Sequence, residues 1–365
     1  MNRSVPARFL LSAALLRGVI GCATTAPKPT CPDSRDSQAT EPRPTASGST
    51  IESESGFLSN IRQLTFESQG FFNAGEAYFS PDERSIIFQA TPIGQEVYQI
   101  YTMELDGGRT RMVSTGRGAC TCAFFHPDGR RIIYASSHLD PTLGQEETRA
   151  DDEAESEYKW AFDEHMDIFE ADPDGSNLKR LTDVPGYDAE GSYSPDGSRI
   201  VFTSQRDGDL EVYVMDADGA NPRRITKAKG YDGGPFFSPD GRTILYRGDR
   251  RNDGEMNLQL RIVNADGTDD RAITDNAVFN WCPYWYPDGR SFIYTRADHR
   301  GRPNYDLYMM KVDGGDPIRI TFNAAFDGLP VFNHDGTKLM WTSQRGGLSE
   351  PQVFIADFAA PNSLR

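Results

Sequence analysis

Short apolar segments separated by Asp-Gly turns run through most of this chain, and the pattern predicts β-strands. In one copy, residues 199–202 form an apolar segment, and the side chains of residues 210–215 alternate as they do along a β-strand. A short third segment, residues 224–226, ends with Thr226. Alternation with a period of two, bounded by Asp-Gly turns, is typical of antiparallel hairpins. With the aromatic segment that precedes each copy, the pattern predicts units of four strands.

The unit repeats along the chain, and a Ser-Pro-Asp-Gly turn marks each copy. The intervals between copies are 46, 68, 44, 48 and 47 residues. Periods of about 40–50 residues are typical of propeller blades. Pro presets φ, Asp bonds its own backbone and Gly accepts positive φ, so we interpret the motif as the structural hairpin between the first two strands of each blade. The copies, some of them degenerate, begin at Ser80, His126, Ser194, Ser238, Tyr286 and Asn333.

The two ends of the repeat region complement each other. The last unit has no fourth strand after residues 352–358, whereas residues 61–66 carry the fourth-strand signature without a blade of their own. We therefore predict an all-β, six-bladed β-propeller with 3+1 closure, in which residues 61–66 complete the last blade. Such closure leaves no exposed inner edge.

The first residues have the features of an export signal. Arg3 and Arg8 precede an apolar run at residues 9–16, which is too short to span a bilayer. Cys22 directly follows Val-Ile-Gly, which resembles the bacterial lipobox and implies lipidation of Cys22. Ala23 after the cysteine implies the outer membrane by resemblance to bacterial sorting rules. Plain secretion is the alternative, because Arg17 interrupts the apolar run.

Three segments follow from this interpretation. Residues 1–21 are the predicted signal peptide, and residues 57–365 are the predicted propeller. Residues 22–56 are rich in Pro, Ser, Thr and Glu. Such a composition cannot bury enough apolar surface to fold, so it predicts a disordered lipoprotein tether.

Three motifs recur in phase, Ser-Pro-Asp-Gly, Asp-x-Asp-Gly and Arg-x-Leu-Thr, and together they resemble the TolB-type (PD-repeat, WD40-like) propellers over about residues 57–360. TolB has an α/β domain before its propeller, whereas this chain has a polar stretch there. The resemblance implies a periplasmic or envelope protein that binds a protein or peptide near its central channel. It implies no cofactor.

Strand order places two sets of loops on one face of the propeller, which we call the mouth face. The first set joins the fourth strand of a blade to the first strand of the next blade. The second set joins the second and third strands within a blade. Loops of this kind, carried by a rigid scaffold, are where binding residues gather. The first set carries an aromatic residue followed by Asp or Asn. The predicted ring at the channel mouth comprises Asn73, Asp188, Asp232, Asn280 and Asp327, with Tyr187, Tyr231 and Phe326 beside it.

Two interpretations of this ring stay open. The side chains could bond a neighbouring loop and lock blade to blade, or they could offer acceptors to a cationic peptide or a metal. The second set of loops brings basic side chains to the same face, which could pair with the ring or contact carboxylates of a partner. These are His138, Arg206, Arg250 and Arg345.

Charge and cysteine content narrow the function. The net charge of −16 argues against nucleic acid, which requires Lys and Arg at its phosphates.

The one long interval holds an acidic run at residues 140–157, which could be a solvated loop, a lid or a docking arm. Cys120 and Cys122 could be redox-active or simply buried, and Cys122 and Cys282 lie on opposite blades, too far apart for a disulfide.

The sequence contains no Gly-x-Ser-x-Gly elbow and no phosphate-binding Gly-Lys-Ser/Thr loop. Its histidines show no ligand spacing. We therefore predict a non-catalytic envelope lipoprotein whose propeller binds a protein or peptide at its mouth face. The alternative is a metal-dependent propeller lyase or hydrolase that uses the Asp/Asn ring.

Overall fold

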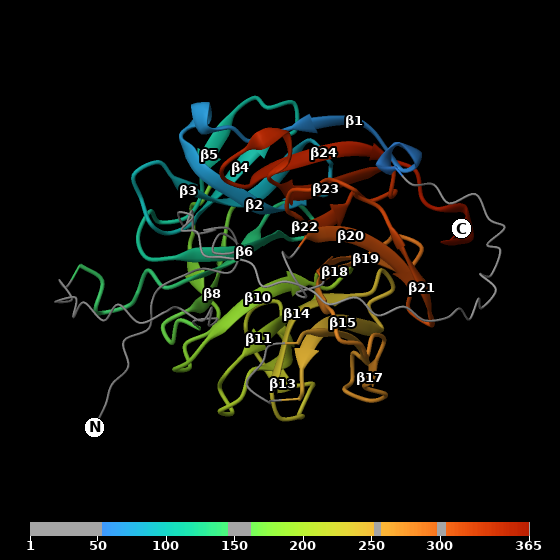
Figure 1. The fold of residues 1–365 in the computed structure, drawn as a ribbon. Coiled ribbons are helices and arrows are strands. Elements are labelled where there is room, and N and C mark those ends of the chain that lie inside the picture. Colours follow the sequence, from blue (N-terminus) through green and yellow to red (C-terminus); the bar gives the residue numbers. More distant parts are fainter. Residues whose placement is uncertain (1–52, 145–161, 252–256, 298–303, 365) are drawn as a thin grey trace, which may run out of the picture.

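A computed structural model describes residues 53–144, 162–251, 257–297 and 304–364. They form six antiparallel sheets of four strands each, arranged as blades around a central channel (Figure 1). The predicted all-β six-bladed propeller is confirmed. The inner strands, which surround the channel, are β2 (Phe71–Phe79), β6 (Cys120–Phe125), β10 (Asp188–Tyr193), β14 (Tyr231–Phe237), β18 (Phe279–Trp285) and β22 (Asp327–Phe332).

The remaining strands of each blade follow outward in chain order. The second strands are β3 (Ser85–Pro92), β7 (Ile132–Ser136), β11 (Arg199–Ser204), β15 (Thr243–Asp249), β19 (Ser291–Ala297) and β23 (Lys338–Ser343). The third strands are β4 (Gln99–Glu104), β8 (Asp167–Ala171), β12 (Glu211–Asp216), β16 (Gln259–Asn264), β20 (Tyr305–Lys311) and β24 (Gln352–Phe358). The outer strands of the first five blades are β5 (Thr110–Met112), β9 (Lys179–Arg180), β13 (Arg223–Arg224), β17 (Arg271–Ala272) and β21 (Gly314–Arg319).

The last blade closes the ring as predicted. Its strand order is β1-β24-β23-β22, and β1 lies beside β24 in Figure 1 although the two come from opposite ends of the chain. The strand β1 (Leu58–Gln63) begins and ends earlier than the predicted residues 61–66. The backbone contact continues beyond it, because the N–H of Leu64 donates to the carbonyl of Val353 at 2.8 Å.

A hydroxyl at the end of each outer segment explains the recurring Thr of the Arg-x-Leu-Thr motif. It accepts an N–H near the start of the neighbouring third strand in every blade, at 2.8–2.9 Å. In the last blade Thr65 performs this role, which shows that β1 is a genuine fourth strand. The hydroxyls belong to Ser114, Thr182, Thr226, Thr274, Thr321 and Thr65.

The Ser-Pro-Asp-Gly turns have the predicted structural role. In the copy at Ser194, the Asp196 carboxylate accepts bonds from the Ser194 hydroxyl at 2.6 Å and the Ser198 N–H at 3.0 Å, and Gly197 has a φ of 71°. These bonds lower the pKa of Asp196 to about 2. The Asp of this motif is therefore occupied by its own turn.

Each inner strand contains a bulge at the same position, four residues before the turn motif. The residue there has a φ between 47° and 58°, and the pairing register shifts beside it. A bulge redirects one side chain out of the regular alternation. The six bulge residues, one from each blade, are Glu76, Cys122, Glu190, Gly234, Cys282 and Leu329.

These bulges also hold neighbouring blades together. In four of them the N–H donates to a side chain from the second strand of the preceding blade, at 3.1–3.3 Å. One of these bonds joins Thr342 of the last blade to Glu76 of the first, across the closure. The acceptors are Thr342, Gln89, Thr203 and Thr295.

Candidate functional site: a cavity in the central channel

The central channel contains a cavity of about 40 Å³, and its wall includes all six bulge residues. The cavity has room for about three water molecules. Its lining continues to Tyr78, Phe236, Tyr284 and Val331, which lie two residues nearer the Ser-Pro-Asp-Gly turns. The cavity therefore lies below the mouth, in the half of the channel nearer those turns.

One wall of the cavity is an ion pair between two blades. Arg247 on β15 extends into the space beside Gly234, where a Cβ atom would overlap its guanidinium. The guanidinium bonds Glu190 on β10, and both side chains are at most 5% exposed. Glu190 also accepts the Thr203 hydroxyl at 2.6 Å and the Gly234 N–H at 2.7 Å. A buried pair with this many partners is a structural unit, since removing one member would leave an uncompensated charge.

Glu76 is the other carboxylic acid of the cavity, and its surroundings differ. Part of its side chain borders the hollow, although the residue lies deep inside the ring. Burial raises the pKa of Glu76 to about 7, and the nearby Glu190 carboxylate adds to the rise, whereas the bond from Cys122, the charge of Arg247 and the bond from Tyr78 oppose it. The Tyr78 hydroxyl donates to Glu76 at 3.4 Å, a long hydrogen bond. Glu76 therefore exchanges a proton near neutral pH.

The cysteines of the channel are thiols. Cys120, Cys122 and Cys282 are all buried and form no disulfide. Burial raises the pKa of each, for Cys120 to about 11. A buried thiol with a raised pKa is a poor nucleophile, so these residues act as small apolar side chains.

Aromatic rings form the floor of the cavity. Tyr78, Phe124, Phe236 and Tyr284 come from four blades and contact one another with ring centroids 5.0–6.4 Å apart. On the mouth side, the indole N–H of Trp281 has no acceptor among the described residues, although the side chain is only 2% exposed. A buried donor of this kind calls for an ordered water or a ligand atom.

The predicted carboxylates of the ring lie at the mouth face but are buried and paired within their own blades. Asp188, Asp232 and Asp327 are at most 1% exposed. Their partners are the predicted arginines: Arg206 on Asp188 at 3.0 Å, Arg250 on Asp232 at 2.7 Å and Arg345 on Asp327 at 3.0 Å.

Burial raises the pKa of all three carboxyl groups, that of Asp232 to about 6, although the arginines act in the opposite direction. The carboxylates hold the arginine side chains in place. The ring also joins neighbouring blades, because the N–H groups of Asp188 and Asp232 donate to carbonyl groups of the preceding blade at 2.9 Å. The Asn280 amide likewise donates to Gln259 of the preceding blade at 3.2 Å.

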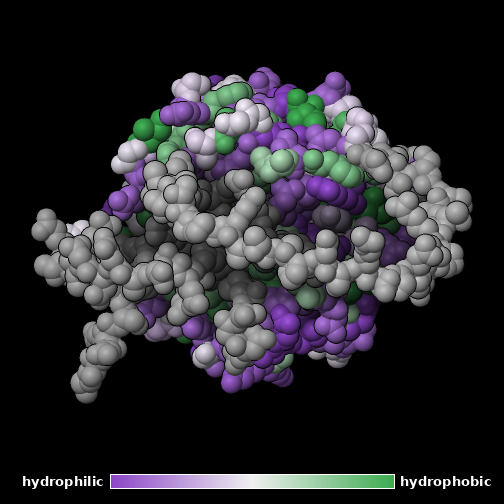
Figure 2. Space-filling model, in the orientation of Figure 1, coloured by the Kyte–Doolittle hydropathy of each residue, from purple (hydrophilic) through white to green (hydrophobic). Residues whose placement is uncertain are grey.

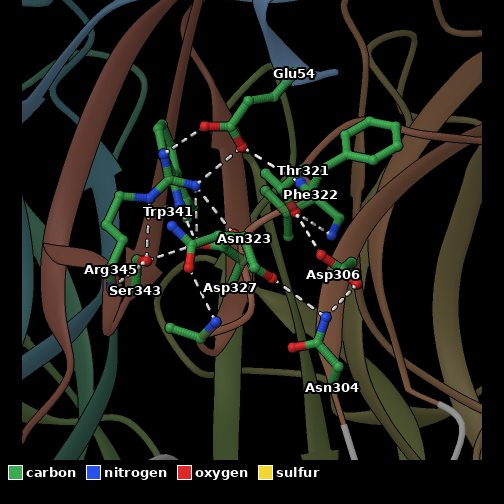
Figure 3. Close-up of polar contacts among 12 residues, drawn as sticks. Glu54, Asn304, Asp306, Thr321, Phe322, Asn323, Asp327, Trp341, Ser343 and Arg345 are labelled. Atoms are coloured by element: carbon green, nitrogen blue, oxygen red, sulfur yellow. Dashed lines mark hydrogen bonds and ion pairs between the residues drawn. The ribbon is translucent and has the colours of Figure 1, made fainter. Parts of the chain in front are cut away.

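Figure 3 shows this arrangement in the last blade. Asp327 accepts bonds from the Trp341 indole at 2.9 Å, the Ser343 hydroxyl at 2.6 Å and Arg345. Arg345 also binds Glu54 at 3.1 Å, and Glu54 belongs to a short turn, η2 (Glu54–Gly56). The sequence analysis places Glu54 in the predicted tether, and the described residues begin at residue 53.

The other predicted mouth residues also have internal roles. The Asn280 amide donates to Val278 and Asn276 at 2.9 and 3.0 Å, and Asn73 is 3% exposed. The His138 ring bonds the Ser136 hydroxyl at 2.9 Å, and burial together with nearby arginines lowers its pKa. The aromatic residues Tyr187, Tyr231 and Phe326 lie in one buried cluster with Trp281 and Phe279.

None of the twelve predicted mouth residues lines the cavity. The residues that sequence reasoning missed are Glu76, Glu190 and Arg247. The register that aligned Cys122 with Cys282, four residues before the turn, would have found Glu76 and Glu190 if it had been applied to every blade. No periodic signal marks Arg247, which reaches the channel from a second strand.

Within the described ranges, no group of three or more His, Cys, Asp or Glu side chains is arranged to hold a metal ion. Among the residues that the structure places, none forms a helix with the length and apolarity needed to cross a bilayer. Cys22 and most of the acidic run, residues 145–157, lie outside the described residues.

Comparisons with known proteins agree on the fold. The model of the tricorn protease N-terminal β-propeller domain matches residues 155–303. An uncharacterized protein of Agrobacterium fabrum is 33% identical over 126 residues, a match that spans 34% of this chain and 34% of that relative. The chain thus matches about a third of the length of that curated relative.

Two solved structures resemble the whole propeller. A putative TolB from Agrobacterium tumefaciens has a TM-score of 0.55 at 20% identity, and the match covers 82% of this chain and 97% of that one. An oligogalacturonate lyase from Vibrio parahaemolyticus has a TM-score of 0.54 at 15% identity, covering 84% and 94%. Identities this low establish a shared fold, which by itself assigns no activity.

Proposed function

We propose that this chain, a TolB-like six-bladed β-propeller, is a non-catalytic envelope lipoprotein that binds a protein or peptide partner at its mouth face. The internal roles of the Asp/Asn ring mean that the partner would meet mainly the loops around it. The fixed guanidinium groups of Arg206 and Arg250, 13% and 22% exposed, would contribute polar contacts at the centre.

The distribution of exposed hydrophobic side chains carries this proposal. The described residues expose eight large hydrophobic side chains, and five of them belong to the mouth face. Hydrophobic side chains gathered on one face favour a protein-binding role for that face. Figure 2 shows one side of the molecule, on which hydrophobic residues lie among hydrophilic ones near the upper edge. The five residues are Phe66, Phe72, Ile93, Leu139 and Val184.

Two of these residues belong to adjoining loops of the first blade. The N–H of Ile93 donates to the carbonyl of Gly70 at 2.9 Å, which places the β3–β4 loop against the start of β2. Phe72 and Ile93 are 43% and 54% exposed. Anchors of this kind dominate the energy of protein interfaces when a partner buries them.

The envelope location rests on the sequence. The basic start, the short apolar run and Cys22 after Val-Ile-Gly support export and lipidation, and Ala23 favours the outer membrane. A lipid at Cys22 would hold the propeller at the membrane through the polar stretch, with the mouth free to meet a partner in the periplasm.

Affinity capture from envelope extracts of the producing bacterium tests the mouth-face assignment. The double variant Phe72→Asp/Ile93→Asp should recover at least tenfold less of the proteins that the unchanged chain captures. The matched control is Leu178→Asp, because Leu178 is 36% exposed on the opposite face, in the turn before β9. Equal recovery by the double variant would place the partner surface elsewhere.

The alternative, a metal-dependent lyase or hydrolase, is supported only by the fold shared with the oligogalacturonate lyase. The Asp side chains that it would use are paired with arginines. The partner-binding function is therefore better supported.

A further inference from the structure

The charges that face the cavity do not balance when Glu76 is ionised. The facing groups are Glu76 and Tyr78 from β2, Cys122 from β6, Glu190 from β10, Arg247 from β15, and Cys282 and Tyr284 from β18. Arg247 and Glu190 neutralise each other, and the thiols and phenols keep their protons because burial raises each pKa. The strands of the last blade contribute the uncharged Leu329 and Thr342. One carboxylate is left without a cation.

Glu76 also has unused capacity for hydrogen bonds. A carboxylate can accept about four bonds. Its side-chain donors are the Tyr78 hydroxyl at 3.4 Å and the Cys122 thiol, and among the described residues no Lys, Arg or His forms an ion pair with it. Glu190, by contrast, has Arg247, Thr203 and the Gly234 N–H around it.

The rest of the wall suits a small cation. The rings of Tyr78, Phe236 and Tyr284 border the same cavity as the carboxyl group. Aromatic faces attract cations, most strongly where water is excluded. The volume of about 40 Å³ corresponds to about three water-sized groups. An ammonium group with two carbon atoms has this size, and it is more compact than the planar guanidinium of arginine.

We propose that the channel cavity binds one primary ammonium group, held by the Glu76 carboxylate and by the surrounding aromatic rings. The ammonium would be the end of a lysine side chain of the partner, and this source rests on the proposed function. A free small amine has the same chemistry and would occupy the same place.

Titration of the full chain with ethylammonium tests the cavity without any partner. Binding should be saturable, and ethanol, an uncharged molecule of the same size, should not compete. Glu76→Gln should weaken binding at least tenfold. The matched control Glu96→Gln removes the same charge from an exposed loop and should leave binding unchanged.

The indole N–H of Trp281 supplies an independent readout in the unchanged chain. Its NMR signal should shift on addition of ethylammonium, because Trp281 lines the cavity. This measurement does not require the Glu76 variant to fold. An unshifted indole signal together with an absence of saturable binding would overturn the proposal, as would equal binding by Glu76→Gln and the unchanged chain.

A short acetylated and amidated peptide, Gly-Lys-Gly, distinguishes the two sources. If the peptide competes with ethylammonium and its Nε-acetylated form does not, a lysine side chain is the ligand. If ethylammonium binds and neither peptide does, the cavity takes a free small amine. A negative result in the amine assay overturns the cavity proposal alone, because the capture experiment tests partner binding at the mouth face independently.

Discussion

At the scale of the residue, the bulge position of each inner strand determines what the channel contains. The positive φ there turns the side chain into the channel, and the six positions are occupied by two carboxylic acids, two thiols, a leucine and a glycine. The glycine matters as much as the acids, because only Gly234 leaves room for the Arg247 guanidinium. Glu190 thereby receives its counter-charge, whereas Glu76 does not.

The pH dependence of stability should report this difference. Burial raises the pKa of Glu76 to about 7, compared with 4.5 for an ordinary glutamate. Between pH 4.5 and about pH 7 the unfolded chain releases the Glu76 proton before the folded chain does. The stability contributed by protonated Glu76 is therefore full below pH 4.5 and is lost as the pH rises towards about 7.

Glu76→Gln cannot titrate and should lose less stability over the same range, by roughly 2 kcal/mol between about pH 5 and about pH 8. Urea denaturation of both proteins at the two pH values checks this. Parallel losses in the two proteins would mean that Glu76 keeps its ordinary pKa in the fold.

At the scale of the element, the outer strands are short and depend on one hydroxyl each. Several span only two residues, such as β9 and β13. The Thr or Ser beyond them accepts an N–H near the start of the third strand and so fixes the register. In the last blade this element comes from the other end of the chain, and it buries Leu58 and Leu64 to 4% and 2% exposure.

Removal of β1 should therefore be far more damaging than removal of the preceding polar stretch. Deletion of residues 57–66 exposes the edge of β24 and removes two buried leucines, which contribute about 2–5 kcal/mol each when truncated to alanine. We expect the thermal midpoint to fall by about 10 °C or more. Deletion of residues 23–52 is the control and should leave the midpoint unchanged. Equal midpoints would contradict the closure by β1.

At the scale of the whole molecule, the two ends of the channel differ. The mouth half is lined by a buried cluster that includes Tyr187, Tyr231 and Trp281, and the other half holds the cavity above an aromatic floor. Around the mouth, the exposed hydrophobic side chains gather on loops of the first two blades and on the loop that leads to the third. The molecule thus offers a face for a protein and, within, a small cavity whose mainly apolar wall carries Glu76 and the Glu190–Arg247 ion pair.

Attachment to a membrane is the remaining whole-molecule expectation. Cys22→Ser should move the protein from the membrane fraction to the soluble fraction, because an N-terminal lipid is what would hold it there. Cell fractionation with labelled fatty acid checks both steps. If the unchanged chain incorporates no label, plain secretion becomes the correct interpretation.

Much of the fold could be predicted because its determinants are local and repeated. The Pro-Asp-Gly turn sets its own dihedral angles, and Thr226 bonds a strand adjacent to its own. The unmatched strand at the start and the missing strand at the end followed from counting the repeats. The exact bounds of β1 did not, because a register shift between Ser59 and Arg62 has no sequence signal of its own.

The site was predicted less well than the fold, because the partners of its side chains are set by the tertiary structure. From the sequence, Asp188, Asp232 and Asp327 could be either acceptors for a ligand or partners of the basic side chains on the same face. Nothing local decides between these, and the structure shows an arginine 18 residues later folding back on each. The register of Cys122 and Cys282 was visible, and it contained Glu76 and Glu190 as well. Their different chemistry was not visible, because it depends on which other chain segment reaches them.

The sequence by itself thus determined the number of blades, the closure and the positions of the Ser-Pro-Asp-Gly turns, because hairpins and strands obey rules that act over a few residues. Only the tertiary structure decided that Arg247 of the fourth blade pairs with Glu190 of the third, while Glu76 of the first forms no ion pair in the part of the chain that the structure describes. Burial and charge pairing are properties of side chains brought together through space. They cannot be read from residues that lie 57 positions apart in the chain, as Glu190 and Arg247 do.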